Sequence, residues 1–238
     1  MIFTIEDRLS DSPLVDRIWR AQIERPGSLI SIAMSGWEMV VSRYQDKTYM
    51  TVRGPETRAT LLPVSIVGTE FFGIRFKVGT LMPHLPGSSL VDEDVNLPDA
   101  SSKSFWLNGS AWQFPSYENA DTFIDRLVRQ GFLVCDPVVE TSLQGQGNDL
   151  SIRTARRHFL RTIGLTQKAI RQIERARYAA VLLQEGMSIL DVVYEAGYFD
   201  QPHLTRSLKY FIGQTPTQLM QKNGAEQLSF LYKTEPLR

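Results

Sequence analysis

Hydrophobic and polar residues alternate in short runs over the first half of the chain, which is the pattern of half-buried β-strands. The clearest example is 48–53, where Met50 and Val52 alternate with polar and aromatic residues. Similar runs, bounded by turn residues at 45–47 and 54–58, lie at 28–44, 59–67 and 69–79. Several short strands joined by regular turns predict a small barrel or sandwich.

The second half of the chain has the longer period of amphipathic helices. Phe123 and Leu127 share one face of a segment that begins at Ala120. Asp136 and Pro137 then combine a helix cap with a proline at the first helical position, which predicts the start of another helix. Helix signals alternate with short turns over most of the sequence that follows.

These patterns predict an α+β protein with two domains. We expect a β-rich regulatory, sensor or partner-binding domain at 1–115 and an all-helical domain at 120–222, followed by a C-terminal tail at 223–238. Residues 81–102 are rich in proline, serine and acidic residues, and we expect them to be mostly irregular.

The helical half contains an internal repeat. The sequence RHFLRTIGLT begins at Arg157, and the related sequence RSLKYFIGQT begins forty-nine residues later, at Arg206. Both copies place an arginine, a large apolar residue, an Ile-Gly pair and a threonine at equivalent positions. Tandem copies of this kind predict two equivalent helical units.

The first copy predicts a basic amphipathic helix that begins after the capping residue Ser151 and ends at Gly164. One side is an apolar stripe that would dock on a core, formed by Ile152, Ala155, Phe159 and Ile163. The other side is basic or hydroxylated and comprises Arg153, Thr154, Arg156, Arg157 and Arg161. Outward arginines offer forked donors that fit guanine edges and phosphates, so this side is a candidate DNA-binding surface.

The second copy predicts a similar helix after the capping residue Asp200. Its apolar stripe consists of Leu204, Leu208 and Phe211, and its polar side consists of Gln201, His203, Thr205, Arg206 and Lys209. The preceding segment, 188–198, starts with a Ser-x-x-Asp capping box and contains a glycine near its end. Helix, short turn and basic helix together predict a helix-turn-helix, whose second helix enters the DNA major groove.

Residues 166–184 separate the two copies and have apolar residues at helical spacing without glycine or proline. One helix of this length would span ~28 Å, and successive major grooves on one face of a duplex lie ~34 Å apart. We therefore predict a first helix-turn-helix at about 136–163, a linker helix at 166–184 and a second helix-turn-helix at about 188–212. A rigid linker of this size would place both basic helices on one face of DNA.

The chain has a formal net charge of +0, but the charge is unevenly distributed. Residues 1–150 contain 13 Lys+Arg against 19 Asp+Glu, a balance of −6, whereas residues 151–222 contain 11 against 5, a balance of +6. The basic excess indicates an anionic partner for the helical domain, although two solvated surfaces of opposite sign would give the same balance.

Several functional classes lack their sequence signals. No basic region followed by an apolar run opens the sequence and no stretch approaches ~18 apolar residues, so we expect a cytoplasmic protein without a membrane span. Cys135 is the single cysteine, and His84, His158 and His203 lie far apart, so we expect no disulfide, metal site or cofactor. Without a nucleophile elbow, a phosphate-binding loop or a catalytic carboxylate pair, the sequence does not predict an enzyme.

The stretch AGYFDQPHLTRSLKYFIGQTP, residues 196–216, resembles the signature of the AraC/XylS family of bacterial transcription regulators. The first copy, LSIRTARRHFLRTIGLT, is similar to the first reading helix of that family, and the resemblance covers roughly 120–222. It implies control of transcription by sequence-specific binding to double-stranded DNA. It also implies base-reading roles for Arg153, Arg156, Arg157, Gln201, His203, Thr205 and Arg206. The sequence departs from the family pattern at Pro202 and in the longer turn at 144–149.

Regulators of this family often carry a small β-barrel sensor domain, so the resemblance implies a cupin-like fold for the first half. Candidate ligand-binding residues there are Trp37, Tyr44, Arg53, Arg75, Trp106 and Trp112. Aromatic residues of small β-domains lie more often in the core than in a pocket, and surface ion pairs are the commoner fate of strand-end arginines. The tryptophan-rich segment 104–115 could cover a barrel mouth or pack between the domains.

Three functions agree with these observations. The first is a DNA-binding regulator that a small-molecule effector modulates through the N-terminal domain. The second keeps the DNA-binding domain but makes the N-terminal half a dimerisation or partner module without a ligand. Candidate protein partners of the whole protein are a second copy, in a homodimer, and RNA polymerase. The third is a DNA-repair enzyme that uses the helical half as an anchor, for which Cys135 is the only nucleophile candidate.

Overall fold

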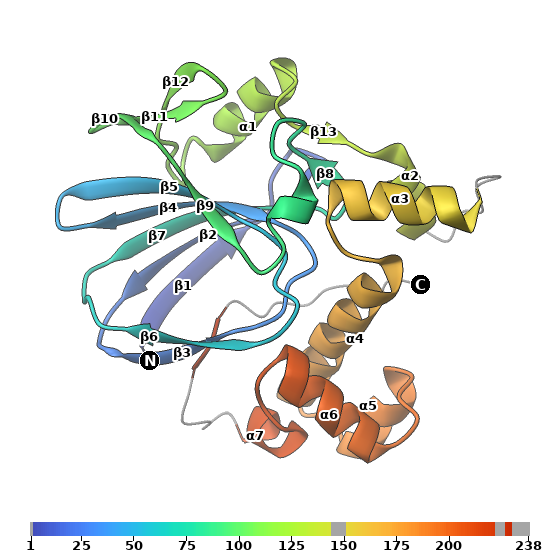
Figure 1. The fold of residues 1–238 in the computed structure, drawn as a ribbon. Coiled ribbons are helices and arrows are strands. Elements are labelled where there is room, and N and C mark those ends of the chain that lie inside the picture. The colour runs from blue at the N-terminus through green and yellow to red at the C-terminus, as the bar shows by residue number, and fades with distance from the viewer. Residues whose placement is uncertain (1, 144–150, 222–226, 230–238) are drawn as a thin grey trace.

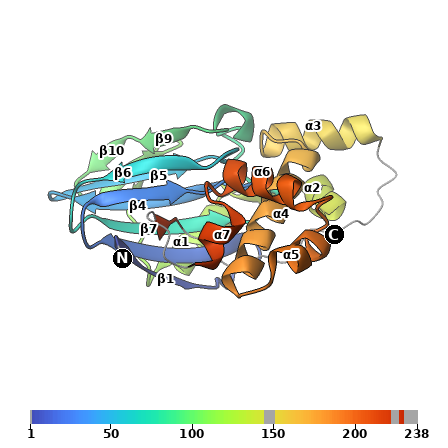
Figure 2. The same cartoon turned by 90° about the horizontal axis from the view of Figure 1, so that it is seen from below.

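A computed structural model describes residues 2–143, 151–221 and 227–229 of the chain. A strand-rich half precedes a helical half, as the hydrophobic patterns predict (Figure 1). Viewed from below, the strands and helices α2 to α6 again occupy opposite ends of the molecule (Figure 2). The glycine-containing turn expected at 144–149 lies outside the described residues.

The largest sheet has six antiparallel strands in the order β1-β2-β7-β4-β5-β9. They are β1 (Phe3–Arg8), β2 (Val15–Ile23), β7 (Glu70–Phe76), β4 (Glu38–Tyr44), β5 (Lys47–Arg53) and β9 (Asp94–Leu97). The predicted turn at 45–47 joins β4 to β5. Gln45 and Asp46 there have φ values of 49° and 62°, the left-handed conformation that a tight two-residue hairpin turn requires.

Three smaller sheets complete the strand-rich half. In the first, β3 (Gly27–Ser31) lies between β6 (Thr60–Val64) and β14 (Gln227–Leu228), so a segment near the C-terminus returns to the first half of the chain. The second consists of β10 (Asp99–Ser101), β11 (Ser104–Leu107) and β12 (Ser110–Gln113). In the third, β8 (Thr80–Leu81) pairs with β13 (Val134–Cys135).

The expectation that residues 81–102 are mostly irregular is wrong for the second half of that segment. The segment contains β9, β10 and a short 3-10 helix, η1 (Gly87–Ser89). Both strands lie at the edge of a sheet and most of their residues are exposed, so acidic side chains occur in them without burial of charge.

Helix α1 (Ala120–Arg129) shares its hydrophobic core with the strands rather than with the later helices. Phe123 and Leu127 of α1 lie in one buried cluster with Phe105 of β11 and Trp112 of β12. The rings of Trp112 and Phe123 meet edge to face, with centroids 5.8 Å apart. The hydrophobic pattern predicts that the helical domain starts at residue 120, whereas α1 packs with the strand-rich half.

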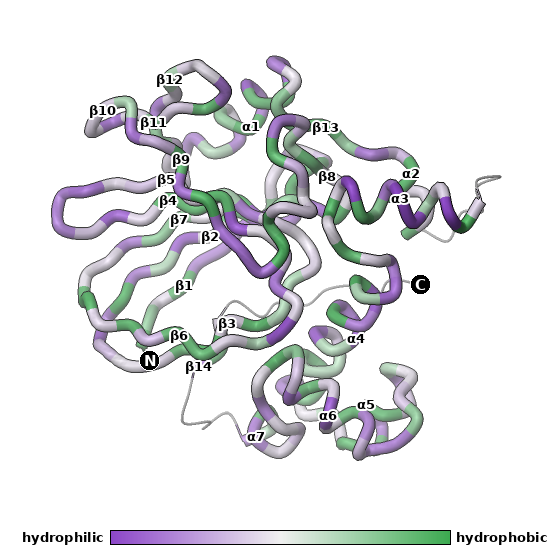
Figure 3. The backbone as a smooth tube through the Cα atoms, in the orientation of Figure 1, coloured by the Kyte–Doolittle hydropathy of each residue, from purple (hydrophilic) through white to green (hydrophobic). Residues whose placement is uncertain are grey.

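The helical half contains α2 (Pro137–Leu143), α3 (Ile152–Thr162), α4 (Gln167–Gln184), α5 (Ile189–Glu195), α6 (Gln201–Phe211) and α7 (Pro216–Met220). A polar side chain caps each helix from α3 to α7 by accepting a backbone hydrogen bond from the first turn; the caps are Ser151, Thr166, Ser188, Asp200 and Thr215. Hydrophobic and hydrophilic residues recur in alternating bands along α3 and α6 (Figure 3). In the described part of the chain, no helix is long and apolar enough to cross a membrane.

Two hydrophobic clusters hold these helices in place. Phe159 of α3 and Ile163, which follows its last residue, lie in one cluster with Ile170 and Ile173 of the first turns of α4. Helices α5, α6 and α7 cover the rest of α4 in the second cluster. Each cluster also includes residues of the strand-rich half: Ala33 belongs to the first, and Ile30 and Ile32 belong to the second. The helical half is therefore docked on the end of β3 and the segment that follows it.

Two adjacent residues of β11 test this description of the core. Phe105 is fully buried, whereas Trp106 is 45% exposed. We expect Phe105→Ala to lower the free energy of unfolding by about 3–5 kcal/mol, because it removes buried apolar surface and leaves a cavity. The control Trp106→Ala is expected to cost less than about 1 kcal/mol. Urea unfolding followed by circular dichroism measures both, and equal losses would contradict the assignment of the core.

Candidate nucleic-acid interface

Helix α3 docks through one side and leaves its basic side in solvent. Phe159 and Thr162 are 1% exposed, and they face the core. The opposite side includes four exposed arginines and a half-buried threonine, namely Arg153, Arg156, Arg157, Arg161 and Thr154. Ile152, expected in the buried stripe, is 89% exposed, because the first turn of α3 extends beyond the cluster that holds Phe159.

Asp136 fixes the buried side of α3. One of its carboxylate oxygens accepts a hydrogen bond from Thr162 Oγ1 at 2.9 Å and lies 2.8 Å from His158 Nδ1. The other oxygen caps α2 by accepting from the backbone N–H of Val138 at 3.0 Å. Burial alone would raise the pKa of Asp136, but the bonds to His158 and Thr162 outweigh it and hold the pKa below its ordinary value. Asp136 stays ionised and joins α2 to α3, while Arg161 lies 3.8 Å from the same carboxylate.

The second helix-turn-helix has the same layout. Gly197, with a φ of 65°, makes the turn between α5 and α6, and Asp200 caps α6 by accepting from the backbone N–H of His203 at 2.6 Å. Leu204 and Leu208 are fully buried. The residues predicted to contact DNA lie on the other side of α6: Gln201, Arg206 and Lys209 are exposed, and His203 and Thr205 are half-buried.

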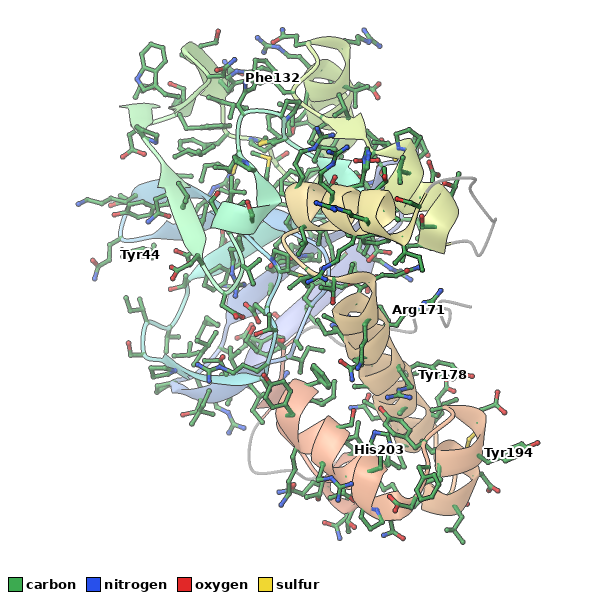
Figure 4. The ribbon with its side chains drawn as sticks, turned by 45° about the vertical axis from the view of Figure 1, so that its right-hand side comes forward. Tyr44, Phe132, Arg171, Tyr178, Tyr194 and His203 are labelled. Carbon is green, nitrogen blue, oxygen red and sulfur yellow. The ribbon has the colours of Figure 1, made fainter. Side chains whose placement is uncertain are left out.

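The ring of His203 lies between α5 and α6 at the start of the second basic helix (Figure 4). It meets the ring of Tyr198 edge to face at 5.1 Å, and its Nδ1 accepts from the backbone N–H of Phe199 at 3.4 Å. Tyr198 is in turn covered by Arg175 of α4, whose guanidinium lies 4.5 Å from the ring centre. These contacts hold the leading turn of α6 in a fixed orientation.

The basic residues of α3 and α6 differ from most arginines of the strand-rich half. Arg8, Arg17, Arg20, Arg53 and Arg75 each form an ion pair with Asp or Glu. Within the described ranges, no ion pair involves Arg153, Arg156, Arg157, Arg206 or Lys209. Their charges are thus exposed to an external anion on two repeated helices.

Large exposed apolar side chains lie beside α6, and sequence reasoning did not identify them. Leu190 and Tyr194 of α5 are 72% and 88% exposed, and Phe199 in the following turn is 91% exposed. Tyr194 projects away from the helices (Figure 4). Val192 and Ala196, four residues apart, are buried, and Tyr194 midway between them points to the opposite side.

The linker helix α4 is anchored in the strand-rich half by a buried arginine. Arg177 is 2% exposed, and its Nη1 donates to the carbonyl oxygen of Ala33 at 3.1 Å. Its Nε lies 3.9 Å from a carboxylate oxygen of Glu174, one turn earlier. Burial lowers the pKa of Arg177 to about 10, and the nearby Glu174 opposes that effect, so Arg177 remains charged at neutral pH.

A cavity of about 470 Å³ lies between the main sheet and the β3–β6 pair. Its walls are largely apolar and include Phe3, Trp19, Leu29, Leu62 and Phe71. Five charged residues also line it: Glu38, Arg53, Glu56, Arg75 and Arg177. Glu38 is 2% exposed, and its carboxylate oxygens lie 3.3 Å from Arg53 Nη1 and 3.4 Å from Arg75 Nη2. Burial raises the pKa of the neighbouring Glu56 carboxyl.

The six candidate ligand-binding residues do not share one site. Tyr44, Arg53 and Arg75 line the cavity. Trp37 is a core residue that stacks on Phe76 and donates from Nε1 to the carbonyl oxygen of Thr80 at 2.7 Å. Trp112 is 1% exposed in the main core, and Trp106 is 45% exposed on β11. Across the described residues there is no group of three or more His, Cys, Asp or Glu that could hold a metal ion.

Comparison with known proteins gives a match for the helical half. A family model described as a helix-turn-helix domain matches residues 148–222. No curated protein is similar enough in sequence to count as a relative. Among solved structures, ToxT from Vibrio cholerae aligns with a TM-score of 0.42 at 8% identity, over 92% of this chain and 98% of ToxT.

A second structure of ToxT from Vibrio cholerae O395, bound to (E)-4-(8-methylnaphthalen-1-yl)but-3-enoic acid, aligns with a TM-score of 0.39 at 9% identity. It covers 92% of this chain and 98% of ToxT. Similarity this weak transfers no property of ToxT to the present chain. The family match and the two exposed basic helices agree with the resemblance found in the sequence. Residues 148–222 therefore form a helix-turn-helix domain.

Proposed function

We propose that α3 and α6 are two recognition helices of one chain, which read base edges in successive major grooves of a DNA duplex. The observation that carries this proposal is that both copies of the repeat form a capped helix with a buried apolar side and an exposed basic side. A helix that served only to pack against the core would not need an exposed side of basic residues that form no ion pairs within the described chain. The α4 helix, which joins the two copies, supplies a spacer of 18 residues.

Each of the two helices has residues assigned to base edges and residues assigned to phosphates. Base contacts are assigned to Arg153, Arg156 and Arg157 of α3 and to Gln201, His203, Thr205 and Arg206 of α6. Thr154, Arg161 and Lys209 lie toward the flanks and are assigned to the phosphate backbone. Arginine suits guanine, because its fork donates to O6 and N7 together, and glutamine pairs in the same bidentate way with adenine. Contacts of Lys and Arg to phosphate make the affinity fall as salt rises.

The substitution Arg206→Ala tests this assignment. A base contact contributes to the preferred site only, so we expect affinity for that site to fall by about 1–3 kcal/mol, a factor of roughly 5–150. Affinity for a scrambled duplex of equal length should change much less. Fluorescence anisotropy with both duplexes measures the two losses at one salt concentration.

Arg129→Ala is the matched control for this substitution. Arg129 lies on α1 and its side chain is 82% exposed, so its removal alters the net charge by the same amount away from α3 and α6. We expect the control to leave both affinities nearly unchanged. Equal losses on the two duplexes in Arg206→Ala would mean that Arg206 contacts phosphate and reads no base.

We also propose that the cavity between the sheets holds a small-molecule effector. Its size, its apolar walls and its buried charged groups are features of ligand sites rather than of a collapsed core. The fitting chemical class is a molecule with an apolar body and one group that can pair with Glu38, Arg53 or Arg75. The alternative function, in which the first half is a dimerisation or partner module without a ligand, assigns no occupant to this cavity.

A thermal-shift screen with compounds of that class distinguishes the two. A ligand at a hundred times its Kd stabilises the folded state by about 2.7 kcal/mol, which raises the Tm by several degrees. Ala21 lines the cavity and Ala21→Phe fills part of it, so the variant should lose the shift. Trp106→Ala, away from the cavity, should retain it. A shift that survives Ala21→Phe would place the compound elsewhere, and a screen without any shift would favour the partner module.

The structure gives no support to the enzyme hypothesis at its one candidate nucleophile. Burial raises the pKa of the Cys135 thiol to about 11, with further contributions from the hydrogen bond to Glu140 and from its charge. The Cys135 sulfur lies 3.4 Å from a Glu140 carboxylate oxygen. A nucleophilic cysteine needs a positive neighbour that stabilises the thiolate, and Cys135 has the opposite environment.

A further inference from the structure

We propose that the strand-rich half sets the relative placement of α3 and α6 by holding the C-terminal end of each helix. The contacts occur at the two glycines that the internal repeat makes equivalent, Gly164 and Gly213. Residues 54–59 and 86–93, which we call the clasp, provide this support together with Ile30 and Ala33. The inference rests on the proposed function, in which both helices read DNA, because the residues of the clasp then act as positioning residues for binding.

The clasp meets the end of α3 without room for a side chain. A Cβ atom built on Gly164 would lie 2.4 Å from Val91 Cγ2 and 2.8 Å from the carbonyl oxygen of Gly87. From the other side, a Cβ atom on Gly87 would lie 2.3 Å from the carbonyl oxygen of Thr162. Real Cβ contacts are never this short, so two glycines allow the clasp and the end of α3 to touch.

The end of α6 is held by hydrogen bonds as well as by close contact. The last carbonyl groups of a helix have no partner within it. Here the carbonyl oxygen of Tyr210 accepts from the backbone N–H of Ala59 at 2.9 Å, and that of Phe211 accepts from the N–H of Ala33 at 2.7 Å. A Cβ atom on Gly213 would lie 2.8 Å from Ile30 Cγ2 and 3.2 Å from Ala59 Cβ.

The two parts of the clasp are bonded to each other. The carboxylate of Asp92 accepts from both the N–H and the hydroxyl of Thr57, each at 2.7 Å. The N–H of Asp92 donates to the carbonyl oxygen of Pro55 at 2.8 Å, and the N–H of Gly54 donates to that of Glu93 at 3.0 Å. The ends of α3 and α6 are thus connected through a second route besides the linker helix α4.

Because the clasp also connects α3 to α6, the linker helix α4 is not alone in setting the angle between them. Only Ile163, Gly164, Leu165 and Thr166 separate α3 from α4, and Gly164 has a φ of 82°, so this turn is a place where α3 could pivot. The clasp contacts α3 at this turn. Its bonded loops reach α6 in the other hydrophobic cluster, so they fix the angle between the two basic helices.

The distance between α3 and α6 can be measured in the full chain without DNA. Spin labels on Arg157→Cys and Arg206→Cys, in a Cys135→Ser background, report it by double electron–electron resonance. We expect one narrow distance distribution. Gly87→Ala should make it about twofold broader or displace it by several ångströms, because the added methyl group pushes α3 away from the clasp.

Matched glycine variants separate this effect from backbone strain. Gly164 and Gly213 have φ values of 82° and 84°, and Gly186 at the end of α4 has 94° with no atom within 4 Å of a built Cβ. Alanine strains the backbone at all three positions, but it crowds the clasp only at the first two. We expect Gly164→Ala and Gly213→Ala to change the distribution and Gly186→Ala to leave it unchanged.

One further variant loosens the clasp without crowding. Asp92→Gly removes both bonds to Thr57 and suits the left-handed φ of 57° at this position. A broader distribution in Asp92→Gly supports the proposal even if Gly87→Ala fails to fold. An unchanged distribution in folded Asp92→Gly and Gly87→Ala would overturn it and leave α4 as the only spacer. Since no DNA is present, this result is independent of whether α3 and α6 read bases.

Discussion

The structure depends on the need of short amphipathic helices for a surface on which to dock. Helices α3 and α6 have 11 residues each, and isolated helices of that length are marginal in water. Each is stable because it buries one apolar side, through Phe159 in α3 and through Leu204 and Leu208 in α6. Burial of one side exposes the other, so the condition that stabilises these helices also presents their basic residues to solvent.

The docking surface comes from both halves of the chain. The segment after β3 is the point where the halves meet: Ala33 accepts a hydrogen bond from Arg177 of α4 and donates one to the end of α6. Ile32 and Met34, on either side of it, line the cavity between the sheets. The wall of the cavity and the docking surface of the helices therefore involve the same few residues.

The features that the sequence predicts well are those with local causes. The linker helix was expected at 166–184 and α4 occupies Gln167–Gln184, because a threonine cap and uninterrupted apolar spacing define it without reference to the rest of the fold. The basic sides of α3 and α6 follow from the same spacing. Of the residues proposed for ligand binding, Tyr44, Arg53 and Arg75 line the cavity, and their role stays a prediction.

Features that depend on tertiary contacts were not predictable in this way. Trp37 and Trp112 lie in or next to strands, and residues that line a cavity can have the same local sequence. Only the arrangement of the sheets places both tryptophans in the core. The clasp depends on the approach of loops that are distant in sequence from the glycines they contact.

The most direct test of the central claim is selection of sheared genomic DNA by the full-length protein at physiological salt with excess competitor. We predict one enriched motif with two blocks about one helical turn (~10 bp) apart. A single block, or no motif, would contradict reading by two helices.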